Sequence, residues 1–168
     1  MTQTTDSNSS KTSKPAALGS QHKPIHCLLI PLNEETMLLP NAAVAEVVDY
    51  IEPEPIHDAP AWLLGRILWR DRTVPLVSFE AASGGKRIAS GSANRIAVLN
   101  TLNSSSRVPY IAVVLQGIPR LRQIKDDKDV QQDTLSGRPS VAANLIVDDS
   151  PVLVPDIDDL ETRLVQLI

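Results

Sequence analysis

Cysteine and aromatic residues are scarce in this chain of 168 residues. The single cysteine, Cys27, excludes an intrachain disulfide and lies in an apolar run, so we expect a reduced, buried thiol. Aromatic residues make up 3% of the sequence, and aliphatic side chains must therefore fill the interior. Of the two tryptophans, Trp62 lies beside leucines and near a glycine, and we expect it in the core.

A cluster of basic residues is also missing. The formal net charge is −4 at pH 7, whereas nucleic-acid-binding domains carry a basic face that neutralises phosphates. Binding single strands by base stacking needs exposed rings, which so few aromatic residues do not supply. The sequence therefore predicts that nucleic acid is not a partner.

The first part of the chain lacks a long hydrophobic run. Residues 1–24 are rich in polar side chains and hold too few large apolar groups to offset the entropy of ordering. They match neither a signal peptide nor a membrane span. We expect a disordered N-terminal leader at 1–24, a folded domain at 25–168, and a cytoplasmic protein that does not insert into membranes.

Residues with metal-ligating spacing are lacking too. His22, His26 and His57 fall in a tail, a strand and a loop, without the close pairing typical of zinc sites. A hairpin tip explains Asp148 and Asp149 better than a cation site does, because hard cations need several converging oxygens. We expect no metal and no cofactor.

Sequence motifs for catalysis are absent. Residues 84–86 read Gly-Gly-Lys, but Glu80 stands where a phosphate loop has its leading glycine, and Arg87 replaces the hydroxyl residue that binds magnesium. A Gly-x-Ser-x-Gly nucleophile elbow does not occur. We therefore do not expect an enzyme.

Short apolar segments separated by turn residues make up most of the chain. We expect a hairpin at 25–39 and a strand at 44–50, where β-branched residues favour a strand over a helical turn. A proline-rich, stiff loop at 52–61 precedes a second hairpin at 63–79. Further strands are expected at 95–99, 109–115, 121–124, 143–147 and 152–154, with flexible or solvated connections at 81–94, 100–107 and 125–139.

A helix is predicted at the C-terminus. Asp158 and Glu161 have the spacing of a capping box, which predicts a helix that begins at about Asp158. We expect three leucines on the face that packs on the strands and two charged residues in solvent. These are Leu160, Leu164 and Leu167, and Glu161 and Arg163, respectively.

The segment 60–80 carries the most informative pattern. It reads Pro-Ala-Trp-Leu-Leu-Gly-Arg-Ile-Leu-Trp-Arg-Asp-Arg-Thr-Val-Pro-Leu-Val-Ser-Phe-Glu, with a proline before leucine and glycine and a strand that ends at Arg70. In this order it resembles the core signature of the CheW-like adaptor domains of bacterial chemosensory systems. The dipeptide Trp69-Arg70 and residues 61–65 look closest to the ChpC-type members associated with type IV pilus clusters.

Other segments extend this resemblance over about 25–168. Leu38-Leu39-Pro40 followed by Val44-Ala45-Glu46-Val47 looks like the family's second strand and its Val-x-Glu-Val stretch. Residues 113–115 look like the strand before its regulatory turn, and the predicted C-terminal helix looks like its closing element.

The resemblance implies a mostly β fold of two small five-stranded, SH3-like barrels that share a core and are closed by a C-terminal helix. It implies no active site. Family members couple the cytoplasmic tip of a methyl-accepting chemoreceptor to the like-folded regulatory domain of a CheA-type histidine kinase. By position, Val44 and Glu46 would belong to the receptor-facing surface, and Arg70 would be the arginine that ends the signature strand.

Two residues depart from the family pattern. Asp71 stands where the family usually has glycine, and Gln116 stands where an aspartate often closes the later strand. Aspartate tolerates a positive φ better than most residues, so we expect the turn to survive. The carboxylate at the tip changes its electrostatics and with it the choice of partner.

Two functions from different classes remain. The first is a non-catalytic adaptor for pilus-driven twitching motility, supported by arginines and a tryptophan of the kind enriched in interface hot spots. These are Arg66, Trp69, Arg70 and Arg72, which in the other interpretation are solvated or fill the core. The second function is a small ligand-binding or hydrolytic barrel that uses residues 81–94 as a lid.

Overall fold

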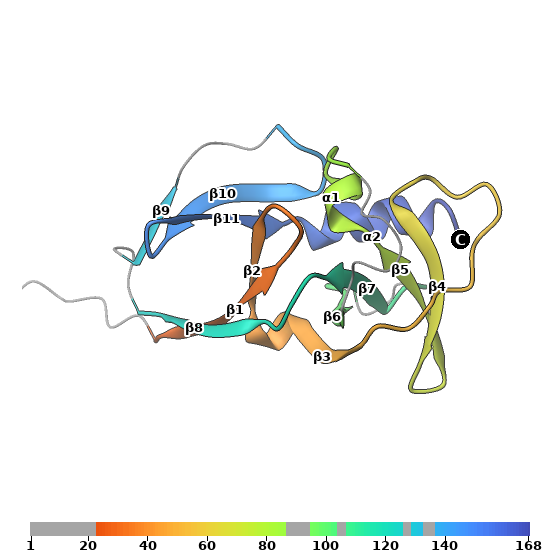
Figure 1. The fold of residues 1–168 in the computed structure, drawn as a ribbon, viewed down its shortest axis with the longest axis horizontal. Coiled ribbons are helices and arrows are strands. Elements are labelled where there is room, and N and C mark those ends of the chain that lie inside the picture. The colour runs from red at the N-terminus through yellow and green to blue at the C-terminus, as the bar shows by residue number, and fades with distance from the viewer. Residues whose placement is uncertain (1–22, 87–94, 104–106, 126–128, 133–136) are drawn as a thin grey trace, which may run out of the picture.

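Two sheets and a C-terminal helix make up the described part of the chain in a computed structural model (Figure 1). The structure describes residues 23–86, 95–103, 107–125, 129–132 and 137–168. We call the six-stranded sheet, at the left of Figure 1, sheet A and the five-stranded sheet, at the right, sheet B. None of the helices in these ranges is long and apolar enough to cross a bilayer.

Sheet A has the strand order β8-β1-β2-β11-β10-β9. Its strands are β1 (Ile25–Pro31), β2 (Thr36–Pro40), β8 (Arg120–Ile124), β9 (Val130–Gln132), β10 (Val141–Val147) and β11 (Ser150–Pro155). Neighbouring strands are antiparallel except β2 and β11, which run parallel and pair through Met37 and Leu153.

Sheet B has the strand order β3-β6-β7-β5-β4. Its strands are β3 (Val44–Asp49), β4 (Leu63–Trp69), β5 (Arg72–Val77), β6 (Arg95–Asn100) and β7 (Tyr110–Leu115). A 3-10 turn, Asn41–Ala43, leads from β2 into β3. The parallel pair here is β5 with β7, which meet at Leu76 and Ala112 and at Val77 and Val113.

The strands bury side chains on both faces, and this produces three apolar clusters. Along β6, Ile96 and Val98 point into a cluster enclosed by sheet B, while Ala97 and Leu99 point into a larger cluster shared by both sheets. A third cluster, which contains Cys27, lies within sheet A. Each sheet thus curls around a core of its own, and we call the two units barrel A and barrel B.

The two barrels repeat one plan. Hairpins β4–β5 and β10–β11 each have a two-residue turn and a bulge at the same place in their registers. Each hairpin runs into a helix: Ser78 caps α1 (Phe79–Ala82), and Asp156 caps α2 (Ile157–Val165). In both barrels a parallel contact joins the hairpin to a three-stranded antiparallel unit, β3-β6-β7 or β8-β1-β2. Positions in one barrel can therefore be compared with positions in the other.

The connection order of the two barrels differs. Barrel B uses one continuous stretch, 44–115, whereas barrel A combines the N-terminal hairpin β1–β2 with β8–β11 from the end of the chain. Helix α2 then packs on the shared cluster through Leu160 and Leu164, both fully buried. Its Arg163 lies 4.5 Å over the ring of Trp62.

Most of the predicted architecture is confirmed. The fold is mostly β with two curled sheets and a C-terminal helix, and only sheet A departs from the expected five strands by having six. The expected burial of Cys27 and Trp62 is also confirmed, with 4% and 9% of their surfaces exposed. The predictions of a leader at 1–24 and of a lid at 81–94 fall largely on residues 1–22 and 87–94, which lie outside the described residues.

The C-terminal helix differs from its prediction in three details. It begins at Ile157, because the carboxylate of Asp156 accepts the Asp159 N–H at 2.9 Å and so takes the capping role expected of Asp158. Of the two charged residues expected in solvent, Glu161 is buried, with 5% of its surface exposed, and Arg163 is half-buried and donates to the carbonyl of Ala82 at 2.9 Å. Leu167, expected on the packed face, follows the end of α2 and is 45% exposed.

One strand end and one loop prediction also need correction. Phe79 begins α1 instead of ending a strand, because the hydroxyl of Ser78 accepts the Ala81 N–H and starts a helical turn. The connection expected at 125–139 contains a short strand, β9, which pairs with β10. This segment becomes a strand because it pairs with β10, which comes later in the chain, and its charged composition does not predict that pairing.

Candidate functional site

Side chains from β3 and from the β4–β5 turn meet at barrel B. The indole Nε1 of Trp69 donates to Oε2 of Glu46 at 2.8 Å, and Nη2 of Arg70 lies 3.0 Å from the same oxygen. The guanidinium of Arg70 lies 4.9 Å from the centre of the Trp69 ring. Since β3 and β4 are the two ends of sheet B, these contacts close the barrel. We call Glu46, Trp69 and Arg70 the barrel B clasp.

The turn that carries Arg70 is tight. Trp69 pairs with Arg72, so Arg70 and Asp71 are the two residues of the loop, and both have positive φ, 46° and 59°. Positive φ at both positions is the geometry of a type I′ turn, whose twist matches that of the flanking strands. The expectation that Asp71 keeps the turn is therefore confirmed. The turn holds Arg70 beside Glu46 while leaving 66% of the arginine side chain exposed.

An aromatic contact links the clasp to β7. The rings of Trp69 and Tyr110 meet edge to face with centres 4.9 Å apart, a favourable geometry for aromatic pairs. The guanidinium of Arg72 lies 5.9 Å from the ring centre of Tyr110. Trp69 is 6% exposed and belongs to the barrel B cluster, so of the two roles considered for it the structure favours the core, and its indole N–H holds Glu46 from there.

The structure brings two of the three predicted site residues together and separates the third. Glu46 and Arg70 are partners in the clasp, whereas Val44 packs against the shared cluster. A bulge in β3 between Val44 and Glu46 causes the separation, because it turns residues that would otherwise share a face toward different clusters. Tyr110 was missed by sequence reasoning, since a tyrosine at the start of a strand carries no local signal of its tertiary partner.

Barrel A has an equivalent clasp with the charges exchanged. Nη2 of Arg122, on β8, donates to Oδ1 of Asp148 at 2.6 Å in the β10–β11 turn. Strand β8 and this turn occupy the places of β3 and the β4–β5 turn in the repeated plan. Asp148 and Asp149 have φ of 50° and 60°, so the predicted hairpin tip is confirmed. One barrel thus presents an arginine followed by an aspartate at its turn, and the other presents two aspartates.

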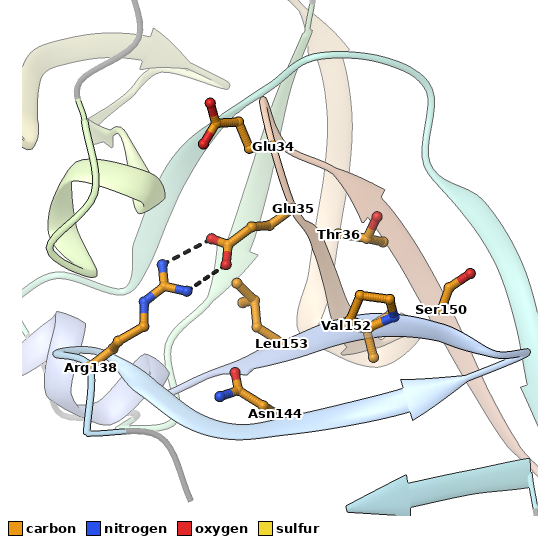
Figure 2. A pocket seen from close by; sticks show the side chains of 9 residues that line it. Glu34, Glu35, Thr36, Arg138, Asn144, Ser150, Val152 and Leu153 are labelled. Atoms are coloured by element: carbon orange, nitrogen blue, oxygen red, sulfur yellow. Dashed lines mark hydrogen bonds and ion pairs between the residues drawn. The ribbon is translucent and has the colours of Figure 1, made fainter. Parts of the chain in front are cut away.

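A hollow of about 550 Å³ opens where the pairing of β2 with β11 stops (Figure 2). Figure 2 shows the carboxylate of Glu35 turned toward the guanidinium of Arg138, which binds both of its oxygens; the Nη2 to Oε2 distance is 2.9 Å. This ion pair raises the pKa of Arg138. Arg138 also donates to the hydroxyl of Ser83 at 2.8 Å. Of the described residues, no histidine lines this hollow, Glu35 is engaged by Arg138, and Figure 2 shows the carboxylate of Glu34 pointing away from Ser150, so no base is placed to activate the Ser150 hydroxyl.

Metal-ligating side chains do not gather in threes anywhere in the described ranges. The family model of the CheW-like domain matches residues 26–164. The chain belongs to the CheW-like domain family. The match spans both barrels and α2 except for one residue at the start of β1 and one at the end of α2.

A solved structure has the same fold. The crystal structure of the scaffolding protein TtCheW from Thermoanaerobacter tengcongensis superposes on this CheW-like domain with a TM-score of 0.65, at 17% sequence identity. The alignment covers 83% of this chain and 89% of that protein. No match was found among the curated proteins.

Proposed function

We propose that this CheW-like domain is a non-catalytic, cytoplasmic chemosensory adaptor that couples the tip of a methyl-accepting chemoreceptor to the regulatory domain of a CheA-type histidine kinase. Family membership over residues 26–164 is the observation that carries the proposal. Adaptors of this kind work by holding partners close together, and they need rigid surfaces with exposed anchor groups.

The clasp supplies such an anchor. Arg70 projects from a tight turn, is held by Glu46 and by the ring of Trp69, and keeps most of its side chain in solvent. Side chains that are ordered before binding lose less conformational entropy when a partner docks. We therefore assign Glu46 and Arg70 to the partner-binding surface, and Val44 to the edge strand that supports it.

Binding to purified partners tests the proposal. The full chain is mixed with the receptor tip and, separately, with the kinase regulatory domain from the same organism, and binding is measured by calorimetry. We expect dissociation constants of about 1–50 μM, the range that keeps a signalling contact reversible. Absence of binding to both partners, with the chain shown to be folded by circular dichroism, would refute it.

A variant of the turn tests the site. Arg70→Ala is expected to weaken partner binding at least about tenfold, whereas it lowers stability by less than about 1 kcal/mol because the Glu46 pair is exposed. Arg120→Ala is the matched control, since Arg120 is an exposed arginine on β8 that makes no ion pair within the described residues. If Arg70→Ala unfolds, Arg70 has a structural role. If both variants lose the same partner affinity, the effect is one of net charge and not of the site.

We assign the pathway to pilus-driven twitching motility on the ChpC-like dipeptide Trp69-Arg70. A strain that lacks this protein should spread less under agar, and the wild-type chain should restore spreading while the Arg70→Ala variant does not. Normal spreading of the deletion strain would place the adaptor in another chemosensory pathway. The ligand-binding or hydrolytic alternative is not favoured, because the family is one of scaffolds and the hollow beside β2 lacks an activated nucleophile.

A further inference from the structure

A second hollow lies at the position in barrel B that corresponds to the hollow of Figure 2 in barrel A. It occupies about 280 Å³ where the parallel pairing of β5 with β7 stops. Its volume suits one or two amino-acid side chains and is below that of sites for larger ligands. The repeated plan therefore leaves a hollow beside the parallel strands of each barrel. We call these two hollows the barrel A mouth and the barrel B mouth.

Charge distinguishes the two mouths. The barrel A mouth holds Glu34 and the neutralised pair of Glu35 with Arg138. The barrel B mouth holds Arg72 and Arg107 and no carboxylate side chain. Neither of these two arginines makes an ion pair within the described residues. Because these two guanidinium groups lack an ion-pair partner in the described part of the chain, the barrel B mouth favours an anion, although the net charge of the chain is −4.

The backbone at this mouth is also available. Ser78 N–H donates to the Trp62 carbonyl, so the backbone groups of Ser78 point to the β4 side of β5. Successive residues of a strand point to alternate sides, and Thr73 and Pro75 therefore direct their backbone groups to the β7 side. Proline has no N–H to leave unsatisfied there, which explains its place in an inner strand. The N–H and C=O of Thr73 lie beyond the last pairing with β7 and face the mouth.

The remaining walls are apolar. Val74 and Val108 line the hollow but are buried, with 1% and 3% exposed, so the apolar groups that a ligand could cover are the exposed Pro109 and Ile168. Tyr110 lies under the guanidinium of Arg72 and limits where that charge can move. An inorganic anion would use the arginines and leave the apolar walls in water, whereas a peptide with alternating acidic and aliphatic side chains would cover both.

We propose that the mouth between β5 and β7 is a docking site for an extended acidic segment of a partner protein. Carboxylates of the segment bind Arg72 and Arg107, whose planar guanidinium groups match carboxylate geometry. Aliphatic side chains of the segment contact the apolar walls, and its backbone bonds to Thr73. This site adjoins the barrel B clasp through Tyr110 and extends the partner surface beyond the residues assigned above.

A peptide titration followed by NMR tests the proposal. The full chain labelled with nitrogen-15 is titrated with a blocked peptide of two glutamates between three valines, and with the same peptide carrying glutamines. We expect saturable shifts at 72–75 and 107–110 from the glutamate peptide, with a dissociation constant below about 2 mM as for short weak ligands, and none from the glutamine peptide. Shifts from both peptides alike, or none, would overturn the proposal.

Variants show whether the two arginines are responsible. The double substitution Arg72→Gln with Arg107→Gln should raise the dissociation constant at least about fivefold, and Arg120→Gln should leave it unchanged. If the double variant is unfolded, 0.5 M sodium chloride on the wild-type chain replaces it and should weaken binding severalfold. Inorganic phosphate that produces the same shifts with equal affinity would assign the mouth to free anions and overturn the docking of a segment. Neither receptor nor kinase is used, so this result is independent of the adaptor function.

Discussion

Gly65 is the residue at which a single added methyl group should cost most. It lies at the bulge of β4 with φ of +148°, a conformation that side chains rarely adopt. A Cβ atom at this position would fall well inside van der Waals contact of the Glu54 carbonyl oxygen and 3.0 Å from Cβ of Pro53. Glu54 cannot move away freely, because its N–H and C=O both bond to Arg66 at 2.8 Å.

The cost of Gly65→Ala follows from these contacts. Backbone strain in such a conformation costs about 1–3 kcal/mol. Overpacking against backbone, relieved only by loosening the Glu54 bridge, adds about 1–3 kcal/mol. We expect a loss of about 3–4 kcal/mol in the free energy of unfolding, and a melting temperature lower by about 10 °C for a domain of this size.

Urea unfolding followed by tryptophan fluorescence measures the loss, since Trp62 and Trp69 are both buried. Two further glycines separate its components. Gly84→Ala adds strain alone, because φ is +88° and the nearest atom is Pro139 Cδ at 3.9 Å, while a Cβ on Gly137 meets nothing within 4 Å. The expected order of losses is Gly65, Gly84, Gly137. A loss at Gly65 no greater than at Gly84 would refute the steric argument.

Two smaller predictions concern the turn and the thiol. Asp71→Gly should change stability by less than about 0.5 kcal/mol, whereas Asp71→Val should lower it by about 1–2 kcal/mol because a β-branched residue resists positive φ; urea unfolding of the pair decides. Burial raises the pKa of the Cys27 thiol, so the unfolded chain ionises first as pH rises, and stability falls as pH passes the ordinary thiol pKa. The wild type should therefore lose more stability than Cys27→Ala between pH 7 and pH 10, and equal losses would contradict the assignment.

Local patterns in the sequence predicted the strands well and the helix start less well. Strand formation in alternating and β-branched runs depends on residues close together in the chain, and for this reason the hairpin at 63–79 and the strand at 44–50 were predicted. Asp158 and Asp156 both have capping side chains, and the choice between them depends on where β11 ends. That end is fixed by pairing with β10, as shown by the Asp156 N–H donating to Ser140 at 2.7 Å.

The candidate site shows the same limit. The resemblance singled out Glu46 and Arg70, and the structure places them in one ion pair. This pair joins strands at opposite ends of sheet B, so the spacing of the two residues in the sequence does not predict it. Val44 stands two residues from Glu46, and only the bulge separates them. The mouth with Arg72 and Arg107 depends on where parallel pairing stops, a tertiary property that composition does not encode.

The interleaved strand order affects how the molecule is made. Of the described strands, β1 and β2 are synthesised first, whereas their partners β8 and β11 follow barrel B, whose strands are complete at Leu115. Closing a long loop is slow, so barrel B has time to assemble while the first hairpin waits unpaired. During that interval the thiol of Cys27 is open to reagents that the folded domain excludes, and its protection reports the moment at which β10 and β11 pack on the first hairpin.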